Sequence, residues 1–367
     1  MATDLTGASP SALAFAPETF AKLQPKSYLL AHLKPSPSRK QPVRPSGRSP
    51  KESRKPVVNT GSLTFSNGSA VVRVGNTAVV CGVRAEILRT SDIPQPYRAP
   101  IPSTIGNNDD AQDQSGAGPG DEIEQLQLIV PNVELSTGCS PEHLPGSPPT
   151  TLAQSLSARV LSLLHISQLL DPADLRITYK DPVSAEENED EPPVKVTKAY
   201  WTLYIDTLVM SLDGNAFDAI WGTVVAALSD TTLPAAHWDA DHETVVCSPT
   251  IADAKALKLN GLPIASTFAV FDTLDPQRST GRTKAGAERD GEEADYWVLA
   301  DPDALEEELC GETVTVVVTP SKGGSGGVLR LEKTGGGVVG KRMMKDLVKS
   351  AEDRWSDWDA ALTRKGG

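Results

Sequence analysis

The chain has 367 residues, a formal net charge of −13 and a hydrophobic fraction of 39%. The negative balance argues against a protein that grips nucleic acid with its whole surface, because neutralisation of phosphates by Lys and Arg supplies most non-specific affinity; a local basic path remains compatible with it. The sequence contains no run of about 18 apolar residues and no charged-then-apolar leader pattern, which predicts neither a membrane span nor secretion.

High Gly and Pro contents, 29 residues each, indicate a folded core diluted by insertions. The four cysteines are far apart in the sequence and form no Cys-x-x-Cys pair, which predicts a reduced, intracellular protein with buried thiols and no metal or other cofactor. These cysteines are Cys81, Cys139, Cys247 and Cys310.

The N-terminal region predicts an arm rather than a domain. Residues 16–33 carry apolar side chains at partly helical spacing, but Pro25 interrupts the run, so two short helices are expected. Residues 34–56 are basic and rich in Pro and Ser, which is typical of an extended segment. We therefore divide the chain into an arm, 1–56, and one domain, 57–363. Three polar or acidic stretches in that domain are predicted to be flexible insertions, near 92–124, 181–196 and 275–295.

Three consecutive antiparallel strands are predicted at the start of the domain, near 57–65, 69–74 and 77–85. They are separated by the turn signals Ser66-Asn67-Gly68 and Gly75-Asn76-Thr77, whose residue types suit tight hairpins.

The remaining elements alternate between strands and well-separated helices. A strand at 126–135 contains Pro131, which indicates a sheet edge or a strand end. The most regular apolar stripe predicts a helix at 150–170, and a long strand at 198–212 precedes an apolar helix at 217–228. Further strands are expected at 266–272, 297–300, 313–319 and 328–332, and a final amphipathic helix at 339–363. This order favours an α+β fold with helices on one face of mixed sheets, in two β-then-α halves near 57–170 and 198–363.

Four segments in this order resemble the RNase PH family of phosphate-dependent RNA-trimming enzymes and their non-catalytic relatives in the exosome ring. The first is the Arg-Pro-x-Gly-Arg entry with its two hairpins, within residues 44–86. The others are LVMSLDGNAFDAIWGTVVAAL (208–228), LPIASTFAVFD (262–272) and VLADPDALEEELCGETVTVVV (298–318). Within the family, CGVRAE (81–86), VPNV (130–133) and the DPDALEEE turn are most similar to a eukaryotic ring subunit.

The resemblance implies a duplicated ribosomal-protein-S5-like βα fold in a hetero-hexameric ring. It also implies RNA in the ring channel, a cap subunit of S1/KH type, associated 3′-to-5′ exoribonucleases, and a place in the nucleus, nucleolus and cytoplasm, where such rings support ribosomal RNA maturation and RNA turnover.

Catalysis by this chain is not expected. The resemblance implies a phosphate ion held by a Thr-Arg pair at the start of the second helix, where helix amides and a guanidinium bind an anion. Ala216 and Phe217 stand there instead, and Asp218 is expected to repel phosphate. Asp301 and Glu307 occupy positions similar to the family's catalytic carboxylates. The alternatives are an active phosphate-dependent 3′-to-5′ exoribonuclease and a scaffold outside RNA metabolism.

Two other motifs carry weak chemical signals. GGGVVGK (335–341) has the spacing of a phosphate-binding loop, but Arg342 follows where Ser or Thr would bind magnesium, so a Gly-rich turn before the last helix is favoured. The His237–His242 segment lacks a third spaced ligand and is interpreted as an exposed loop. His165 is interpreted as an ordinary helix residue.

Basic residues that could line an RNA path concentrate in residues 39–55, including Arg44 and Arg48, and around Arg84 and Arg89. The alternatives for these arginines are salt bridges with partners and solvated loops. Exposed apolar strand edges would also need cover from ring neighbours, so the isolated chain is expected to be poorly soluble or unstable.

Overall fold

We describe the chain from a computed structural model, in residues 16–35, 40–95, 97, 121–145, 150–180, 195–272, 296–319, 327–335 and 339–363. The predicted insertions, and the disorder expected for residues 1–15, lie largely or wholly outside these described residues.

The first sheet is mixed and has the order β1-β2-β3-β6-β4, with β5 pairing to one end of β6. Its strands are β1 (Pro56–Thr60), β2 (Gly68–Val74), β3 (Thr77–Arg89), β4 (Ile129–Leu135), β5 (Arg176–Lys180) and β6 (Lys195–Ser211). β4 runs parallel to β6 and the other pairs are antiparallel. β4 is an edge strand, which explains how it accommodates Pro131.

The second sheet is antiparallel, with the order β12-β11-β13-β14. Its strands are β11 (Ile264–Asp272), β12 (Tyr296–Ala300), β13 (Glu312–Thr319) and β14 (Gly327–Thr334). Two small ribbons complete the described strands: β7 (Thr232–Leu233) with β10 (Lys255–Ala256), and β8 (Ala236–Asp239) with β9 (Thr244–Cys247).

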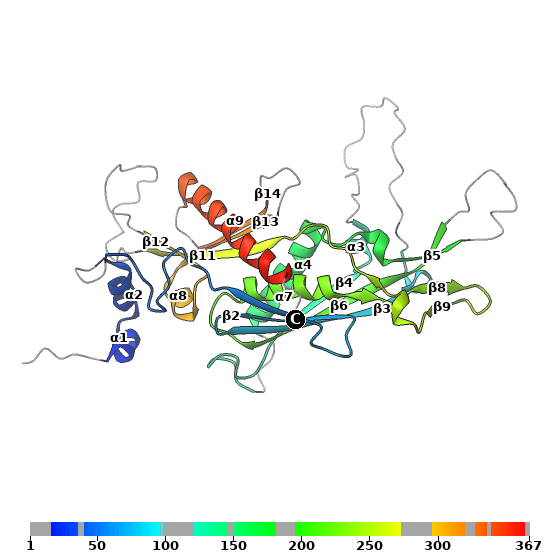
Figure 1. Ribbon diagram of the computed structural model, residues 1–367, viewed down its shortest axis with the longest axis horizontal. Helices are drawn as coiled ribbons and strands as arrows, with labels where there is room; N and C mark the ends of the chain where they lie inside the picture. The colour runs from blue at the N-terminus through cyan, green and yellow to red at the C-terminus, as the bar shows by residue number, and fades with distance from the viewer. Residues whose placement is uncertain are drawn as a thin grey trace, which may run out of the picture.

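The helices pack between and beside the two sheets (Figure 1). They are α1 (Pro17–Leu23), α2 (Pro25–Leu33), α3 (Asp121–Gln125), α4 (Thr151–Ser167), α5 (Pro172–Leu175), α7 (Ala216–Asp230), α8 (Ala304–Leu309) and α9 (Lys341–Thr363), with 3-10 turns η1 (Thr90–Asp92) and η2 (Ile251–Asp253). The long helix α9 lies along the second sheet, and α1 and α2 lie at the far end of that sheet (Figure 1).

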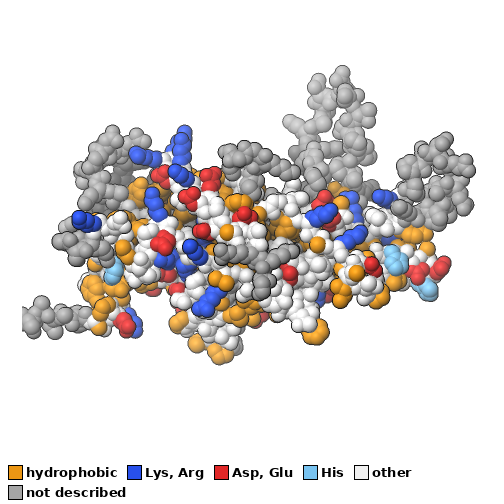
Figure 2. Space-filling model, in the orientation of Figure 1, with side chains coloured by type: hydrophobic (Ala, Val, Ile, Leu, Met, Phe, Trp, Pro, Cys, Tyr) orange, Lys and Arg blue, Asp and Glu red, His pale blue; other side chains and the backbone are white. Residues whose placement is uncertain are grey.

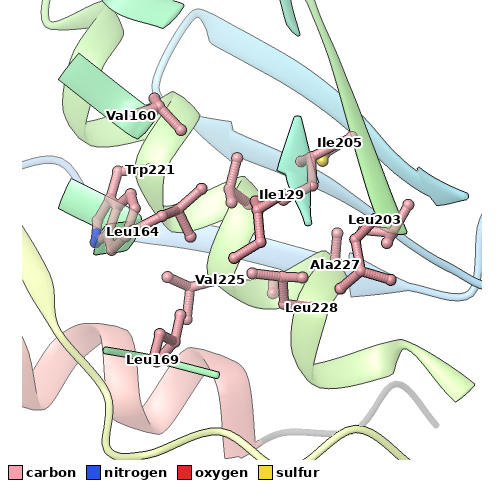
Figure 3. Close-up of a cluster of buried hydrophobic side chains, with 14 of the residues drawn as sticks. Ile129, Val160, Leu164, Leu169, Leu203, Ile205, Trp221, Val225, Ala227 and Leu228 are labelled. Atoms are coloured by element: carbon pink, nitrogen blue, oxygen red, sulfur yellow. The ribbon is translucent and has the colours of Figure 1, made fainter. Parts of the chain in front are cut away.

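Helix α7 forms the centre of the core. Every residue from Ala216 to Leu228 is buried, because α7 packs on the first sheet and also contacts β11 of the second sheet. Figure 3 shows its Trp221, Val225 and Leu228 among side chains of α4, β4 and β6. A helix that is apolar on all sides is expected in such a position.

Most predicted elements are confirmed, and three differences have clear causes. The long strand β6 pairs with β3 and with β4, so it completes the first sheet and does not open a second half at residue 198. Residues 236–247 form the β8–β9 hairpin and not a loop. Helices cover one face of the first sheet, as predicted, but both faces of the second: α9 packs against Phe268 and Val316, and α2 against Phe271 on the opposite face.

The division into an arm and a domain stays a prediction. The two arm helices, interrupted at Pro25, are present, and Leu29 and Leu33 of α2 are fully buried against the second sheet. The four cysteines are unpaired, and three of them are buried. Among the described residues no helix is long and apolar enough to cross a bilayer.

Candidate functional site

A tight turn positions the start of α7. Gly214 and Asn215 both have left-handed backbone conformations, with φ +70° and +51°. A Cβ at Gly214 would lie 2.4 Å from the carbonyl carbon of Asp303, so only glycine allows the turn to approach the loop before α8 this closely. The turn therefore brings the N-terminus of α7 against residues 301–307.

The first two side chains of α7 face the core and not a pocket. Ala216 and Phe217 are 8% and 4% exposed. The Arg159 guanidinium, from α4, lies 3.9 Å from the centre of the Phe217 ring, which is a cation–π contact. Neither side chain offers a hydrogen-bond donor to an anion, as the sequence predicts, and the Phe217 ring is already covered.

Asp301 is buried between the arm and α7, with φ +50°. Its Oδ2 accepts hydrogen bonds from the backbone N–H and Nε of Arg54, both at 2.8 Å. Its Oδ1 accepts from Nη2 of Arg54 at 2.9 Å and from Nδ2 of Asn215 at 2.7 Å. Burial alone would raise the pKa of Asp301, but the charge of Arg354 and the hydrogen bonds and charge of Arg54 hold this pKa well below its usual value. The carboxylate is therefore ionised and engaged with its own chain.

Asp218 also turns inward, which corrects the expectation that it faces and repels a phosphate. It is 2% exposed, and it accepts hydrogen bonds from the backbone N–H of Thr267 at 2.8 Å and from the Thr267 hydroxyl at 2.7 Å. Nδ2 of Asn215 donates to it at 2.8 Å, and Nη1 of Arg354 lies 3.4 Å away. Its charge is thus neutralised by α9 and its oxygens link α7 to β11.

Glu307 lies on α8 with an exposed side chain, and its carboxylate reaches the start of α7. The pKa of Glu307 is raised, first by desolvation and also by the nearby charge of Asp218. The hydrogen bond from the backbone N–H of Asn215 opposes this shift and favours the charged carboxylate. The helix N-terminus, which favours an anion, therefore already has a carboxylate from the same chain.

Arg44 and Arg48 belong to this cluster, and the burial of Arg44 corrects its assignment to an RNA path. Arg44 is 1% exposed; it lies 3.1 Å from Oε2 of Glu306 and donates to the carbonyl oxygen of Pro50 at 2.7 Å. Arg48 donates to the carbonyl oxygen of Asp301 at 3.0 Å, and its guanidinium lies within 4 Å of three carboxylates. The Arg44 guanidinium, enclosed in this way, cannot reach a phosphate of a passing RNA, whereas Arg48 keeps a partly exposed side chain and its RNA contact stays a prediction.

We call this set of residues the α7 cluster. Its arginines are Arg44, Arg48, Arg54 and Arg354, and its carboxylates are Asp213, Asp218, Asp301, Asp303, Glu306 and Glu307. The carboxylates outnumber the arginines, so the local field does not attract phosphate. The arrangement joins the arm, α7, α8 and α9, and among the described residues it presents no side chain arranged to hold an attacking phosphate.

Comparison with known proteins gives the same relationship as the sequence motifs. Residues 52–234 match the RNase PH family, described as the 3′ exoribonuclease family, domain 1. The chain is 30% identical over 343 residues to the exosome complex component rrp43 of Schizosaccharomyces pombe, covering 94% of this chain and 97% of that protein. The chain belongs to the RNase PH family.

Further relatives extend the likeness beyond eukaryotes. The exosome complex component Rrp42 of Methanopyrus kandleri is 29% identical over 306 residues, covering 83% of this chain and 85% of that protein. A solved structure of the Archaeoglobus fulgidus exosome with RNA bound to its active site superposes with a TM-score of 0.57 at 20% identity, over 91% of this chain and 96% of that chain. The last comparison shows the RNase PH fold. The predicted likeness to ribosomal RNA-processing protein 43 is also confirmed.

In this RNase PH chain the predicted site residues lie in two places. The four residues that the family resemblance points to converge at the start of α7; they are Ala216, Phe217, Asp301 and Glu307. The predicted arginines of β3 lie elsewhere. The sequence reasoning missed Arg54, Asn215 and Arg354. The Asp-Gly-Asn turn was a visible signal for Asn215, but Arg354 is separated from Asp218 by 136 residues and only the tertiary fold brings them together.

The other candidate residues lie outside the cluster. Arg84 and Arg89 are exposed on β3; Arg84 lies 3.3 Å from Glu86 and over the Tyr204 ring, and Arg89 donates to Thr244 at 3.2 Å.

Among the described residues, neither the His237–His242 segment nor the GGGVVGK motif forms a metal or phosphate site. In the β8–β9 hairpin His242 contacts Asp239 at 2.8 Å, and the described residues contain no group of three possible metal ligands. The GGGVVGK motif lies between the end of β14 at Thr334 and the start of α9 at Lys341; its residues 336–338 lie outside the described residues, so the Gly-rich turn stays a prediction.

Proposed function

We propose that the chain is a non-catalytic ring subunit of an RNA exosome core, which supports 3′-to-5′ RNA processing and degradation by associated nucleases. The observation that carries this proposal is the α7 cluster. The helix N-terminus that would bind the attacking phosphate in an active relative is enclosed by carboxylates of the same chain, and Ala216 and Phe217 replace the expected Thr-Arg pair. A lost charge-assisted contact costs about 1.5–3 kcal/mol, and both are absent.

The names of the relatives support the ring role, because rrp43 and Rrp42 are exosome complex components. The proposed partners are other RNase PH-like chains, a cap subunit of S1/KH type, and 3′-to-5′ exoribonucleases. The proposed location is the nucleus and nucleolus, and also the cytoplasm. A scaffold outside RNA metabolism is the alternative, and failure to co-purify with other RNase PH-like chains would favour it.

The purified chain is expected to release no nucleoside diphosphates from RNA in the presence of inorganic phosphate. The measurement is product release with and without phosphate, and an active RNase PH relative serves as the positive control in the same buffer. Phosphate-dependent release that exceeds the no-protein background would favour the enzyme alternative instead.

Arg84 and Arg89 are proposed to contact RNA phosphates in the ring, since both are exposed and basic. On the face shown in Figure 2, Lys and Arg side chains are interspersed with Asp and Glu, so a path would be local and not a broad basic band. Replacing both residues with Ala in a reconstituted ring should lower RNA crosslinking severalfold and reduce its salt dependence. Arg73→Ala, an exposed arginine on β2, is the control. Crosslinking that stays at the wild-type level would reject this path.

A further inference from the structure

A loop that is hydrogen-bonded at both ends holds a phenylalanine entirely in solvent. Phe65 is 100% exposed in the loop of residues 61–67 that joins β1 to β2 and projects away from the first sheet (Figure 1). The loop is held at both ends. The Asn67 N–H donates to the Val83 carbonyl at 2.8 Å, and the Asn67 side chain accepts the Ala85 N–H at 2.8 Å. Asp230 accepts the Gly61 N–H at 3.0 Å. An exposed aromatic ring on a loop that is braced at both ends suits an interface, because less loop entropy remains to be lost on binding.

The loop lies beside an uncovered face of the first sheet. Leu63 packs over Gly82, where a Cβ would lie 3.1 Å from Cδ1 of Leu63. Next to Gly82 on that face, Val80 pairs with Leu208, and Met210 follows two residues along β6. Leu63, Leu208 and Met210 are each about 40% exposed, whereas the opposite face of the sheet is buried. The described part of the chain thus leaves several apolar side chains exposed on this outward face of β3 and β6, which we call the β3–β6 face.

The charges around this face favour a protein over RNA. Asp206 pairs in register with Gly82, Glu134 pairs with Leu208, and both are exposed acidic residues. Asp230 supports the loop itself, and the positive charge of Arg84 is offset by Glu86 at 3.3 Å. Single-stranded RNA requires a run of cations along its backbone. The RNA contact proposed for Arg84 and Arg89 lies toward the C-terminal end of β3, and the acidic residues nearer Gly82 and Leu208 would repel RNA there. Exposed apolar side chains next to groups of both charge signs fit a protein interface better than an RNA path.

The size of the face also suits a ring contact. The whole outward face of the first sheet, five strands spaced about 4.8 Å apart over about six residues of β3, has an area on the order of 400–500 Å², and the β3–β6 face is its apolar part. A standard interface buries about 800 Å² per partner, so this face with its loop would supply a large part of one side. A ring requires such non-self-complementary contacts between neighbours.

We propose that the β3–β6 face binds a neighbouring RNase PH-like chain, with Phe65 inserted as an anchor into an apolar pocket of that neighbour. The choice of neighbour rests on the proposed ring function. Exposed anchors of this kind account for most of the affinity at many interfaces, and their loss weakens binding tenfold or more.

The test is incorporation of Phe65→Asp into the ring when the chain is co-expressed with the other ring chains, measured by native mass spectrometry. Because the Phe65 side chain is fully exposed, its replacement should leave the melting temperature of the chain unchanged. Incorporation is expected to fall at least tenfold, and Leu208→Asp should have a similar effect. Ile251→Asp is the matched control, since Ile251 is an apolar side chain that is 90% exposed on η2 and away from this face. It should incorporate like the wild type.

Three results would overturn the inference, and they are distinguishable. If Phe65→Asp incorporates like Ile251→Asp, the anchor is wrong while the ring function stands. If Phe65→Asp assembles normally but RNA crosslinking falls, the loop contacts bases and not a neighbour. If the wild-type chain joins no ring, the proposed function fails together with this inference.

Discussion

Asp301→Asn is expected to lower the free energy of unfolding by about 3–5 kcal/mol, the usual cost of removing one partner from a buried ion pair. The substitution keeps the size of the side chain, and Asn tolerates the φ of +50° at this position. Its main effect is electrostatic: Arg54 and Arg354 lose a carboxylate that lies 2.8 and 3.7 Å from their nitrogens. Urea unfolding at neutral pH measures the change.

The matched control is Asp346→Asn on the exposed side of α9, which should change stability by less than about 0.5 kcal/mol. A variant at Asp301 as stable as this control would show that the buried carboxylate is not ionised in the folded chain.

The pH dependence of the free energy of unfolding, compared between the wild type and Asp301→Asn, gives a second readout. The pKa of Asp301 is lower in the folded chain than in the unfolded chain, so the folded state favours the ionised form. The resulting stability is fully present above about pH 5 and is lost as the pH falls through and below the unfolded pKa of about 4. The stability gap between wild type and Asp301→Asn should therefore be largest near neutral pH and should narrow in acid.

Gly222→Ala is expected to destabilise the chain by about 1–3 kcal/mol through overpacking. A Cβ at Gly222 would lie 2.1 Å from the ring of Trp358, which is 1% exposed and has no free space to move into. The sign of the change in stability is informative, because alanine in a helix interior otherwise stabilises a protein by about 1 kcal/mol relative to glycine. Thermal or urea unfolding of the purified chain measures the effect.

A double-mutant cycle isolates the contact behind this prediction. Trp358→Leu removes the ring that would clash with the new Cβ, so Gly222→Ala should cost much less in that background, with a coupling of about 0.5–3 kcal/mol. Gly311→Ala is the control, because a Cβ there meets no atom within 4 Å. Additive costs in the cycle would contradict a direct α7–α9 contact at this point.

The local elements could be predicted because each has its own chemical signal. Pro25 separates α1 from α2, Pro131 marks the edge strand β4, and the regular apolar spacing of residues 150–170 gives α4. The missed β8–β9 hairpin has only four residues in each strand, and its His and Asp residues gave a weak metal-site pattern that obscured the alternation.

The candidate site could be predicted only in part. That Ala216 and Phe217 stand where the family resemblance implies a Thr-Arg pair is visible in the sequence, and their side chains have no donor for an anion. The role of Arg44 was predicted wrongly and the ion pairs of Arg48 were missed, since a basic, Pro-rich segment has the same composition whether it lies in solvent or is buried against carboxylates. Their partner Glu306 is more than 250 residues away in the chain.

The sequence by itself determined the family, the element order and the absence of donor side chains at Ala216 and Phe217, because these depend on residue identity and short-range spacing. Only the tertiary structure decided that the N-terminus of α7 is enclosed by the α7 cluster, and that Phe65 and the β3–β6 face lie open. Burial and ion pairing depend on contacts between residues far apart in the chain, and no local pattern specifies which arginine meets which carboxylate.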